Sequence, residues 1–168
     1  MTDLQKQRAS KDRFFATDAH SPLTHEQKQH FAGLHYFPEN PSLRLTLSVE
    51  KDPDHQSIQM KTTTGDVQTF IRYGRIRFDA GSQEVALTIF ANHNGFFLPF
   101  ADSLAGKETY GAGRYLDLQP IGGDRFLVDF NNAYNPYCAY NDAWSCPITP
   151  AENRLKIAIR AGEKVFHS

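Results

Sequence analysis

Three cations and a group of flat aromatic side chains stand close together between residues 102 and 154. The cations are Lys107, Arg114 and Arg154, and the aromatic residues are Tyr110, Tyr134 and Trp144. Guanidinium groups bind carboxylates and phosphates through two parallel hydrogen bonds, and aromatic walls bury the remainder of a small ligand. These residue types predict the recognition of a small anionic molecule.

A structural role for the same charges is the alternative. Arg114 and Arg154 would then form internal ion pairs with nearby carboxylates, drawn from Asp102, Glu108, Asp117, Asp129 and Glu152. A buried pair of this kind would lock a loop to the body of the fold, and breaking it singly would be costly. Acid–base chemistry also stays open, because a carboxylate held in a pocket acquires a shifted pKa.

The two cysteines, Cys138 and Cys146, are separated by seven residues. This spacing is neither that of a zinc knuckle nor that of a thioredoxin-like C-x-x-C pair. We therefore expect no metal site. A disulfide, a pair of buried inert thiols and a nucleophilic Cys138 remain alternatives, although no histidine stands near Cys138 in the sequence to act as its base.

Two segments break the regular pattern of the C-terminal half. Residues 102–114 contain three glycines, and Gly111-Ala112-Gly113 permits close backbone approach without matching a dinucleotide or Walker motif. Residues 131–153 lack periodicity, yet they hold three tyrosines, the only tryptophan, both cysteines and three prolines. A loop of this length is uncommon in a compact domain and is often functional, so we expect a packed loop over one end of the fold.

Alternating apolar residues predict that most of the chain is β-structure. Strands are expected at Leu43–Val49, Ser57–Thr63, Val67–Tyr73, Arg75–Phe78, Glu84–Ala91, Phe96–Phe100, Arg114–Leu118, Arg125–Phe130 and, last, Leu155–Ile159. The short connections favour antiparallel pairing. A twisted meander of this size tends to remove its edges by closing into a barrel or folding into a sandwich, and we expect the barrel.

Two capping boxes predict two short N-terminal helices. Thr2 with Gln5, and Thr24 with Gln27, have the spacing at which a hydroxyl and a carboxamide satisfy first-turn amides. The first helix is expected to end near Ala16 and the second near Gly33. The chain is thus expected to form a single domain over 1–168, with a helical segment at 1–35 and a β-barrel at 42–164 that carries the long 131–153 loop.

Composition excludes several classes of protein. The 168 residues are 40% hydrophobic and 22% charged, with a formal net charge of −1. This balance gives no global attraction to nucleic acid or to an anionic membrane, so neither is an expected partner. The N-terminal residues lack the apolar run of a signal peptide, and no window is long and apolar enough to span a membrane. A cytoplasmic protein is the expectation.

Several segments resemble one bacterial and archaeal family. GKETYGAGRYLD at 106–117 and DFNNAYNPYCAY at 129–140 resemble the domain of unknown function 1684 family, as does CPITPAENRLKIAIRAGEK at 146–164. The resemblance extends upstream through 21–45 and 98–110. Its most distinctive positions are Asn135-Pro136, Cys138, Cys146-Pro147 and Glu152-Asn153-Arg154-Leu155. The family carries no established activity, so the resemblance implies where a site lies and not what it does.

The residues together favour a barrel that binds a small anionic molecule in a pocket at one end, under the 131–153 loop. The predicted ligand-binding residues are Lys107, Tyr110, Arg114, Tyr134, Asn135, Cys138 and Arg154. Catalysis in that pocket, any cofactor and the oligomeric state stay open. The alternative is a noncatalytic structural or protein-interaction module in which the signature residues stabilise the fold.

Overall fold

The N-terminal segment of the computed structural model, which describes residues 1–167, begins with two capped helices. Helix α1 spans Asp3–Thr17, and Thr2 and Gln5 form the capping box that the sequence predicts. Helix α2 spans His25–His30 and has the second capping box, from Thr24 and Gln27. The prediction that α2 extends to Gly33 is wrong, because Phe31 is already extended and turns its ring towards Phe15.

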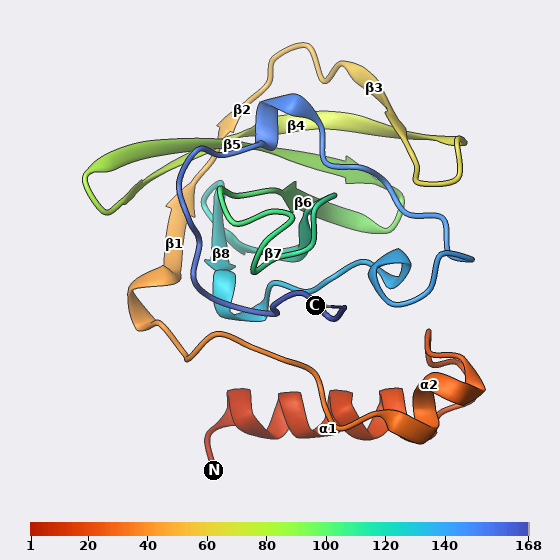
Figure 1. The fold of residues 1–168 in the computed structure, drawn as a ribbon. Coiled ribbons are helices and arrows are strands. Elements are labelled where there is room, and N and C mark those ends of the chain that lie inside the picture. The colour runs from red at the N-terminus through yellow and green to blue at the C-terminus, as the bar shows by residue number, and fades with distance from the viewer. Residues whose placement is uncertain (168) are drawn as a thin grey trace.

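The remainder of the chain is mainly antiparallel β-structure, which confirms the predicted fold class. The strands are β1 Arg44–Ser48, β2 Glu50–Lys51, β3 Ser57–Lys61, β4 Val67–Ala80, β5 Gln83–Asn92, β6 Gly95–Phe100, β7 Arg114–Gly122 and β8 Arg125–Asp129. They pair in the order β1-β8-β7-β6-β5-β4-β2, with β3 also on β4. Only Val49 separates β1 from β2, so the two ends of this order meet and the sheet nearly closes into a barrel (Figure 1).

Gly74 is part of a continuous strand, whereas the sequence predicts two strands divided there. Strand β4 runs for 14 residues, and its register against β5 shifts between Arg72 and Gly74. A β-carbon on Gly74 would lie 2.6 Å from the carbonyl oxygen of Glu50 on β2. Glycine is therefore required because β2 crosses close to β4 where the barrel closes.

The barrel interior is filled by side chains that alternate along the strands. Ile76, Leu87, Leu98, Phe100, Leu116 and Val128 are among its fully or almost fully buried members. Ile159 and Ala161 complete this core from the C-terminal segment. The predicted strand at Leu155–Ile159 is wrong: its alternating apolar residues pack against the barrel, but its backbone meets residues 101–103 through isolated hydrogen bonds that do not form a ladder.

The 131–153 loop is packed and follows the outside of the barrel. Three-residue 3₁₀ turns occur at Phe130–Asn132, Tyr137–Ala139 and Ala151–Asn153. The loop first pairs Tyr134 with Tyr115 on β7, and later donates from the Ile148 amide to the carbonyl of Lys61 at the end of β3. It thus runs between two parts of the sheet and does not simply cap the barrel's end.

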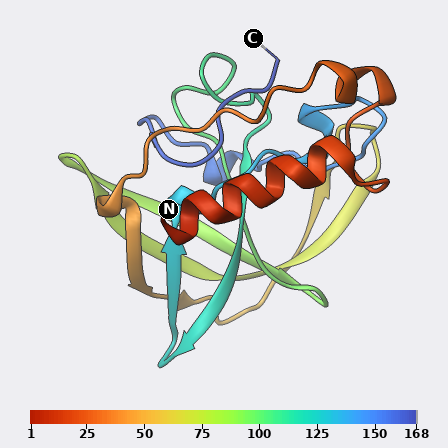
Figure 2. The ribbon, with the colours of Figure 1, turned by 90° about the horizontal axis from the view of Figure 1, so that it is seen from below.

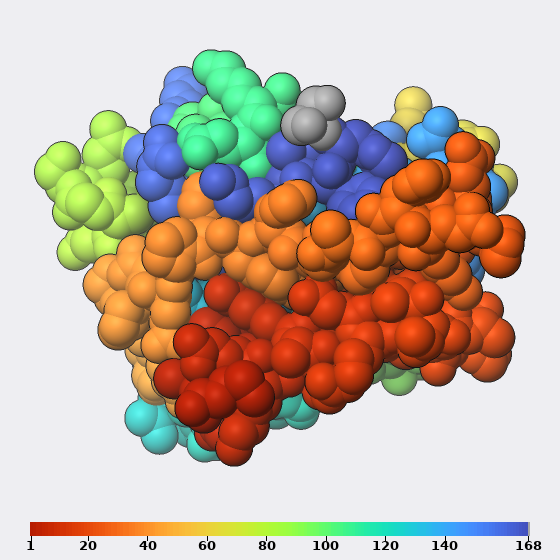
Figure 3. All heavy atoms as spheres, turned by 60° about the horizontal axis from the view of Figure 1, so that its bottom comes forward, coloured from red at the N-terminus to blue at the C-terminus, as the bar shows by residue number. Residues whose placement is uncertain are grey.

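Helix α1 lies across the outside of the barrel, in front of β7 and β8 (Figure 2). Residues 31–43 run beside the helix on the same face (Figure 3), and the Leu34 amide donates to Asp12 of α1. Phe15 packs edge-on against Tyr140, with ring centroids 4.9 Å apart, in a cluster separate from the barrel core. This aromatic cluster joins α1 to the 131–153 loop. No helix in residues 1–167 has the length and apolarity needed to cross a membrane.

Candidate functional site

Arg114 begins β7, and its guanidinium is buried beneath the C-terminal segment. Nη2 donates to the carbonyl oxygen of Ile159 at 2.9 Å, and Nη1 donates to the carbonyls of Ala161 and Glu163. Asp102 lies 3.5 Å from Nη2 and accepts from the Ile159 amide at 2.8 Å. Burial lowers the pKa of Arg114 to about 10, opposed by the negative charge of Asp102.

These contacts leave the Arg114 guanidinium no open face towards solvent. Its side chain is 1% exposed and stacks near Phe100, with 5.0 Å between the guanidinium carbon and the ring centroid. The predicted role of Arg114 as an anion ligand therefore does not fit its surroundings, because its donors already bind the protein's own carbonyls. Its role is to fasten the C-terminal segment across the barrel.

Lys107 and Arg154 are exposed and lie apart from the aromatic surface that the sequence associates with them. Neither lines the cavity described below or the hollows beside it.

Asn135 is buried: its backbone amide donates to Glu163 at 3.0 Å, and its side-chain carboxamide donates to the carbonyl of Lys164 at 2.9 Å. Three of the predicted ligand-binding residues, Tyr110, Tyr134 and Cys138, do come together in one cluster.

A cavity of about 630 Å³ lies between α1, the outer face of β7 and the 131–153 loop. Six aromatic side chains line it: Phe14, Phe15, Tyr115, Tyr134, Tyr137 and Trp144. Trp144 is 40% exposed, and its ring stands edge-on to Tyr137 with centroids 5.1 Å apart. The loop lines the cavity as predicted, but the cavity lies on the outer face of the barrel and not at its end, because Tyr115 and Asp117 point away from the core.

Lys11 of α1 lines the cavity and pairs with a buried carboxylate. The Lys11 ammonium pairs with Glu163, which also accepts from the Tyr140 hydroxyl and the Asn135 amide. The Lys11 side chain is 30% exposed, whereas that of Glu163 is 1% exposed. Lys11 Nζ lies 5.3 Å from the centre of the Tyr134 ring. The cation is thus fixed over an aromatic wall while part of it still faces the cavity.

Asp117 on β7 also lines the cavity. It accepts from the Tyr134 hydroxyl at 2.7 Å. Burial raises the pKa of Tyr134, and the bond to Asp117 raises it further, so the hydroxyl remains a donor. This bond holds the Tyr134 ring between the cavity and a second, smaller hollow of about 230 Å³, which also includes Phe97 and Asn92.

Cys146 lines the cavity, and Cys138 packs beside it in the same cluster. The Cys138 amide donates to Cys146 Sγ at 3.3 Å, and the Tyr110 hydroxyl lies 3.4 Å from Cys138 Sγ. Both cysteines are free and buried. A thiolate at Cys138 is stabilised by hydrogen bonds from the Cys146 thiol, the Tyr110 hydroxyl and Thr63. These bonds outweigh the effect of burial and lower the pKa of Cys138 to about 6. The hydrogen bond between the two thiols raises the pKa of Cys146.

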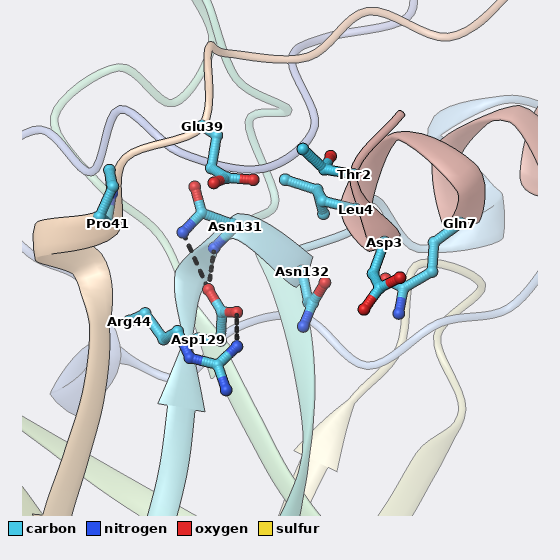
Figure 4. Close-up of a pocket in the computed structure, with 10 residues that line it drawn as sticks. All are labelled: Thr2, Asp3, Leu4, Gln7, Glu39, Pro41, Arg44, Asp129, Asn131 and Asn132. Atoms are coloured by element: carbon cyan, nitrogen blue, oxygen red, sulfur yellow. Dashed lines mark hydrogen bonds and ion pairs between the residues drawn. The ribbon is translucent and has the colours of Figure 1, made fainter.

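A further hollow of about 240 Å³ lies at the start of α1 (Figure 4). Asp129 there accepts from the amide and the carboxamide of Asn131, at 3.0 and 2.9 Å, and pairs with Arg44 at 3.4 Å. The polar groups at its centre are therefore bound to one another. Among residues 1–167, no three His, Cys, Asp or Glu side chains gather as a metal site would require.

The family with the description "Protein of unknown function (DUF1684)" matches residues 29–164, which is most of the chain. This chain belongs to the DUF1684 family. A solution NMR structure of an uncharacterized protein from Haloarcula marismortui is similar to it, with 35% identity and a TM-score of 0.73 over 96% of this chain and 91% of that one. A search of curated proteins finds no match.

The cavity of this DUF1684 protein combines residues inside and outside the matched range. Tyr134, Trp144 and Cys146 lie within residues 29–164, whereas Lys11 and Phe15 of α1 precede them. Reasoning from the sequence missed Lys11, Phe15, Asp117 and Glu163 as members of one site. A weak signal for α1 existed, because two phenylalanines end an otherwise polar helix and must cover an apolar surface elsewhere.

Proposed function

We propose that the chain binds a small molecule with a flat apolar part and an anionic group in the cavity between α1 and the 131–153 loop. The cavity of about 630 Å³, walled by six aromatic side chains, is the observation that carries this proposal. Small-molecule sites in proteins have volumes in the range of roughly 300–1,000 Å³ and are mostly apolar with a few polar groups that fix the orientation of the ligand.

The polar groups of the cavity favour an anion at one place only. Lys11 is the cation of the lining, and a lysine ammonium has three donors, of which Glu163 uses one. Asp117, which also lines the cavity, would repel an anion placed beside it. The ligand would thus place its carboxylate, sulfonate or phosphate at Lys11 and its ring between Tyr134 and Trp144.

A thermal-shift experiment with matched pairs of compounds tests this proposal. Flat aromatic carboxylates and their neutral amides are compared on the wild type, on Lys11→Met and on Trp144→Phe. A ligand that binds only the folded state raises the melting temperature. The carboxylates are expected to stabilise the wild type more than the amides do, Lys11→Met is expected to abolish this difference, and Trp144→Phe is expected to weaken both compounds.

Ile121→Ala is the matched control, because Ile121 is an exposed apolar residue of β7 that lies outside the cavity. It is expected to respond as the wild type does. Equal shifts in melting temperature for carboxylate and amide on the wild type would contradict recognition of an anionic group. Shifts in melting temperature that Trp144→Phe leaves unchanged would show that the compounds bind outside this cavity.

The bonds of the family's signature residues favour a second candidate, a structural role for those residues. The carboxamide of Asn153 donates to the carbonyls of Thr88 and Pro99, and its oxygen accepts from the Thr88 amide, each at 2.8 Å. Together with the buried bonds of Arg114, this supports signature positions that stabilise the fold. In that case, substitution of Arg114 or Asn153 lowers the melting temperature without altering the ligand response of the protein that still folds.

A further inference from the structure

Cys138 and Cys146 are brought together by the path of the 131–153 loop. The chain turns at Tyr137–Ala139 and returns so that the Cys138 amide meets Cys146 Sγ at 3.3 Å. Both thiols lie in one cluster with Tyr115. The two sulfur atoms are therefore neighbours in the fold, although seven residues separate them in the sequence.

The backbone of Cys146 is fixed independently of this contact. Its carbonyl accepts from the Thr63 amide at 3.0 Å, and its amide donates to the Thr63 hydroxyl at 3.3 Å. On the other side, the Tyr110 hydroxyl lies 3.4 Å from Cys138 Sγ. These bonds hold the thiols against each other from two different parts of the sheet and loop, so little motion is needed for the sulfurs to react together.

The pair is not sealed in the protein interior. Cys146 lines the large cavity, and Cys138 and Cys146 remain 6% and 8% exposed. A small molecule that enters the cavity meets Cys146, and Cys138 lies next to Cys146. Buried structural thiols are inert because they lack both access and stabilisation of the thiolate, whereas here the cavity extends to one member of the pair, and the neighbouring hydroxyls and thiol supply hydrogen bonds to a thiolate at Cys138.

We propose that Cys138 and Cys146 form a reactive dithiol that hydroperoxides oxidise to an intramolecular disulfide. The Cys138 thiolate attacks one peroxide oxygen, the O–O bond breaks, and the other oxygen leaves as alkoxide or hydroxide and takes a proton from water. Cys138 is then a sulfenic acid. Cys146 sulfur attacks Cys138 sulfur, the S–O bond breaks, and the hydroxyl leaves as water with the Cys146 proton. Two thiols and one hydroperoxide thus give one disulfide, one alcohol or water molecule, and one further water.

This reaction needs only the two sulfur atoms and an oxidant small enough to enter the cavity, so it does not depend on the proposed ligand. The full-length, fully reduced protein is treated with hydrogen peroxide, and its intact mass and free thiols are followed. The wild type is expected to lose both thiols together, to lose two hydrogen atoms of mass, and to yield one peptide pair linked through Cys138 and Cys146. Dithiothreitol is expected to reverse the change.

Single variants separate the roles of the two sulfurs. In Cys146→Ser, Cys138 is expected to accumulate as a sulfenic acid that dimedone traps, because no second thiol resolves it. In Cys138→Ser, Cys146 is expected to react about tenfold more slowly, because the thiolate is the attacking form. Both substitutions conserve size, and circular dichroism confirms that each variant is folded.

Three outcomes would overturn the proposal. The first is that the thiols of the folded wild type react with peroxide no faster than those of the urea-unfolded chain. The second is oxidation to sulfinic acids without a disulfide. The third is a disulfide that links two chains. A trapped sulfenic acid at Cys146 but not at Cys138 would contradict the assignment of the attacking sulfur.

Discussion

Arg114 Nη2 donates to the carbonyl oxygen of Ile159 at 2.9 Å, and this bond connects the first residue of β7 to the segment that crosses the barrel near the C-terminus. Two further carbonyls of that segment accept from Nη1. The guanidinium of Arg114 thus binds only groups within the protein. An arginine whose neighbours in the sequence suggest an anion ligand is, in the structure, a link between two parts of the backbone.

Replacing Arg114 with methionine is expected to destabilise the protein by about 3–5 kcal/mol, because three carbonyls and the buried Asp102 lose their partner. Arg114→Lys keeps the charge but lacks the planar fork, so it is expected to restore only a minor part of the loss. Urea unfolding followed by circular dichroism measures both free energies. A methionine variant within about 1 kcal/mol of the wild type would refute this fastening role, since removing one partner of a buried pair normally costs more than that.

Gly74→Ala is expected to lower the free energy of unfolding by roughly 1–3 kcal/mol, the usual cost of forcing extra volume into a packed site. The added β-carbon would lie 2.6 Å from the carbonyl oxygen of Glu50, where the barrel closes. Gly111→Ala is the matched control, because the nearest atom to its β-carbon would be 3.7 Å away. Equal stability of the two variants would contradict the close approach of β2 and β4.

The rate at which iodoacetamide alkylates Cys138 is expected to rise through a midpoint near pH 6, because the pKa of Cys138 is lowered to about 6 from an ordinary 9.0. A lowered pKa means that the reactive thiolate persists down to that pH and is lost below it. The assignment of the label by peptide mass spectrometry separates Cys138 from Cys146.

Two variants of Cys146 test the cause of this low pKa. Cys146→Ala removes the donor to the thiolate and is expected to move the midpoint to higher pH. Cys146→Ser keeps a donor there and is expected to move it less. A midpoint unchanged from the wild type in Cys146→Ala would show that the thiol–thiol hydrogen bond does not control the Cys138 pKa.

Local patterns predicted much of the fold because the interactions involved are local. The Thr2 and Thr24 capping boxes need only residues three positions away, and the alternation along β1 and the second half of β4 reflects one buried face. The Leu155–Ile159 segment has the same alternation without a strand, since packing against a barrel end also buries every second residue. A pattern of burial cannot by itself identify the hydrogen-bond partner.

The site was harder to predict because its members come from distant parts of the chain. Lys11 meets Glu163 across 152 residues, and no local pattern brings α1 next to Tyr134 or Trp144. The internal bonds of Arg114 could not be predicted for a related reason: its partners are backbone carbonyls, which every residue has. Tyr110, Tyr134 and Cys138 do lie in one cluster, because Tyr110 shortly precedes β7 and the 131–153 loop pairs with β7 at Tyr115.

The most direct measurement of the central claim uses the only tryptophan of the chain, which lines the cavity. Anilinonaphthalene sulfonate, a flat apolar anion, is titrated into the folded protein while Trp144 emission and dye emission are both recorded. The cavity predicts one saturable site at which Trp144 is quenched and the dye brightens along the same isotherm. Weaker binding is expected for Lys11→Met, and unchanged binding for Ile121→Ala. Non-saturable dye emission with no quenching of Trp144, or equal affinity in the wild type and Lys11→Met, would contradict a cavity that binds a small anion at Lys11.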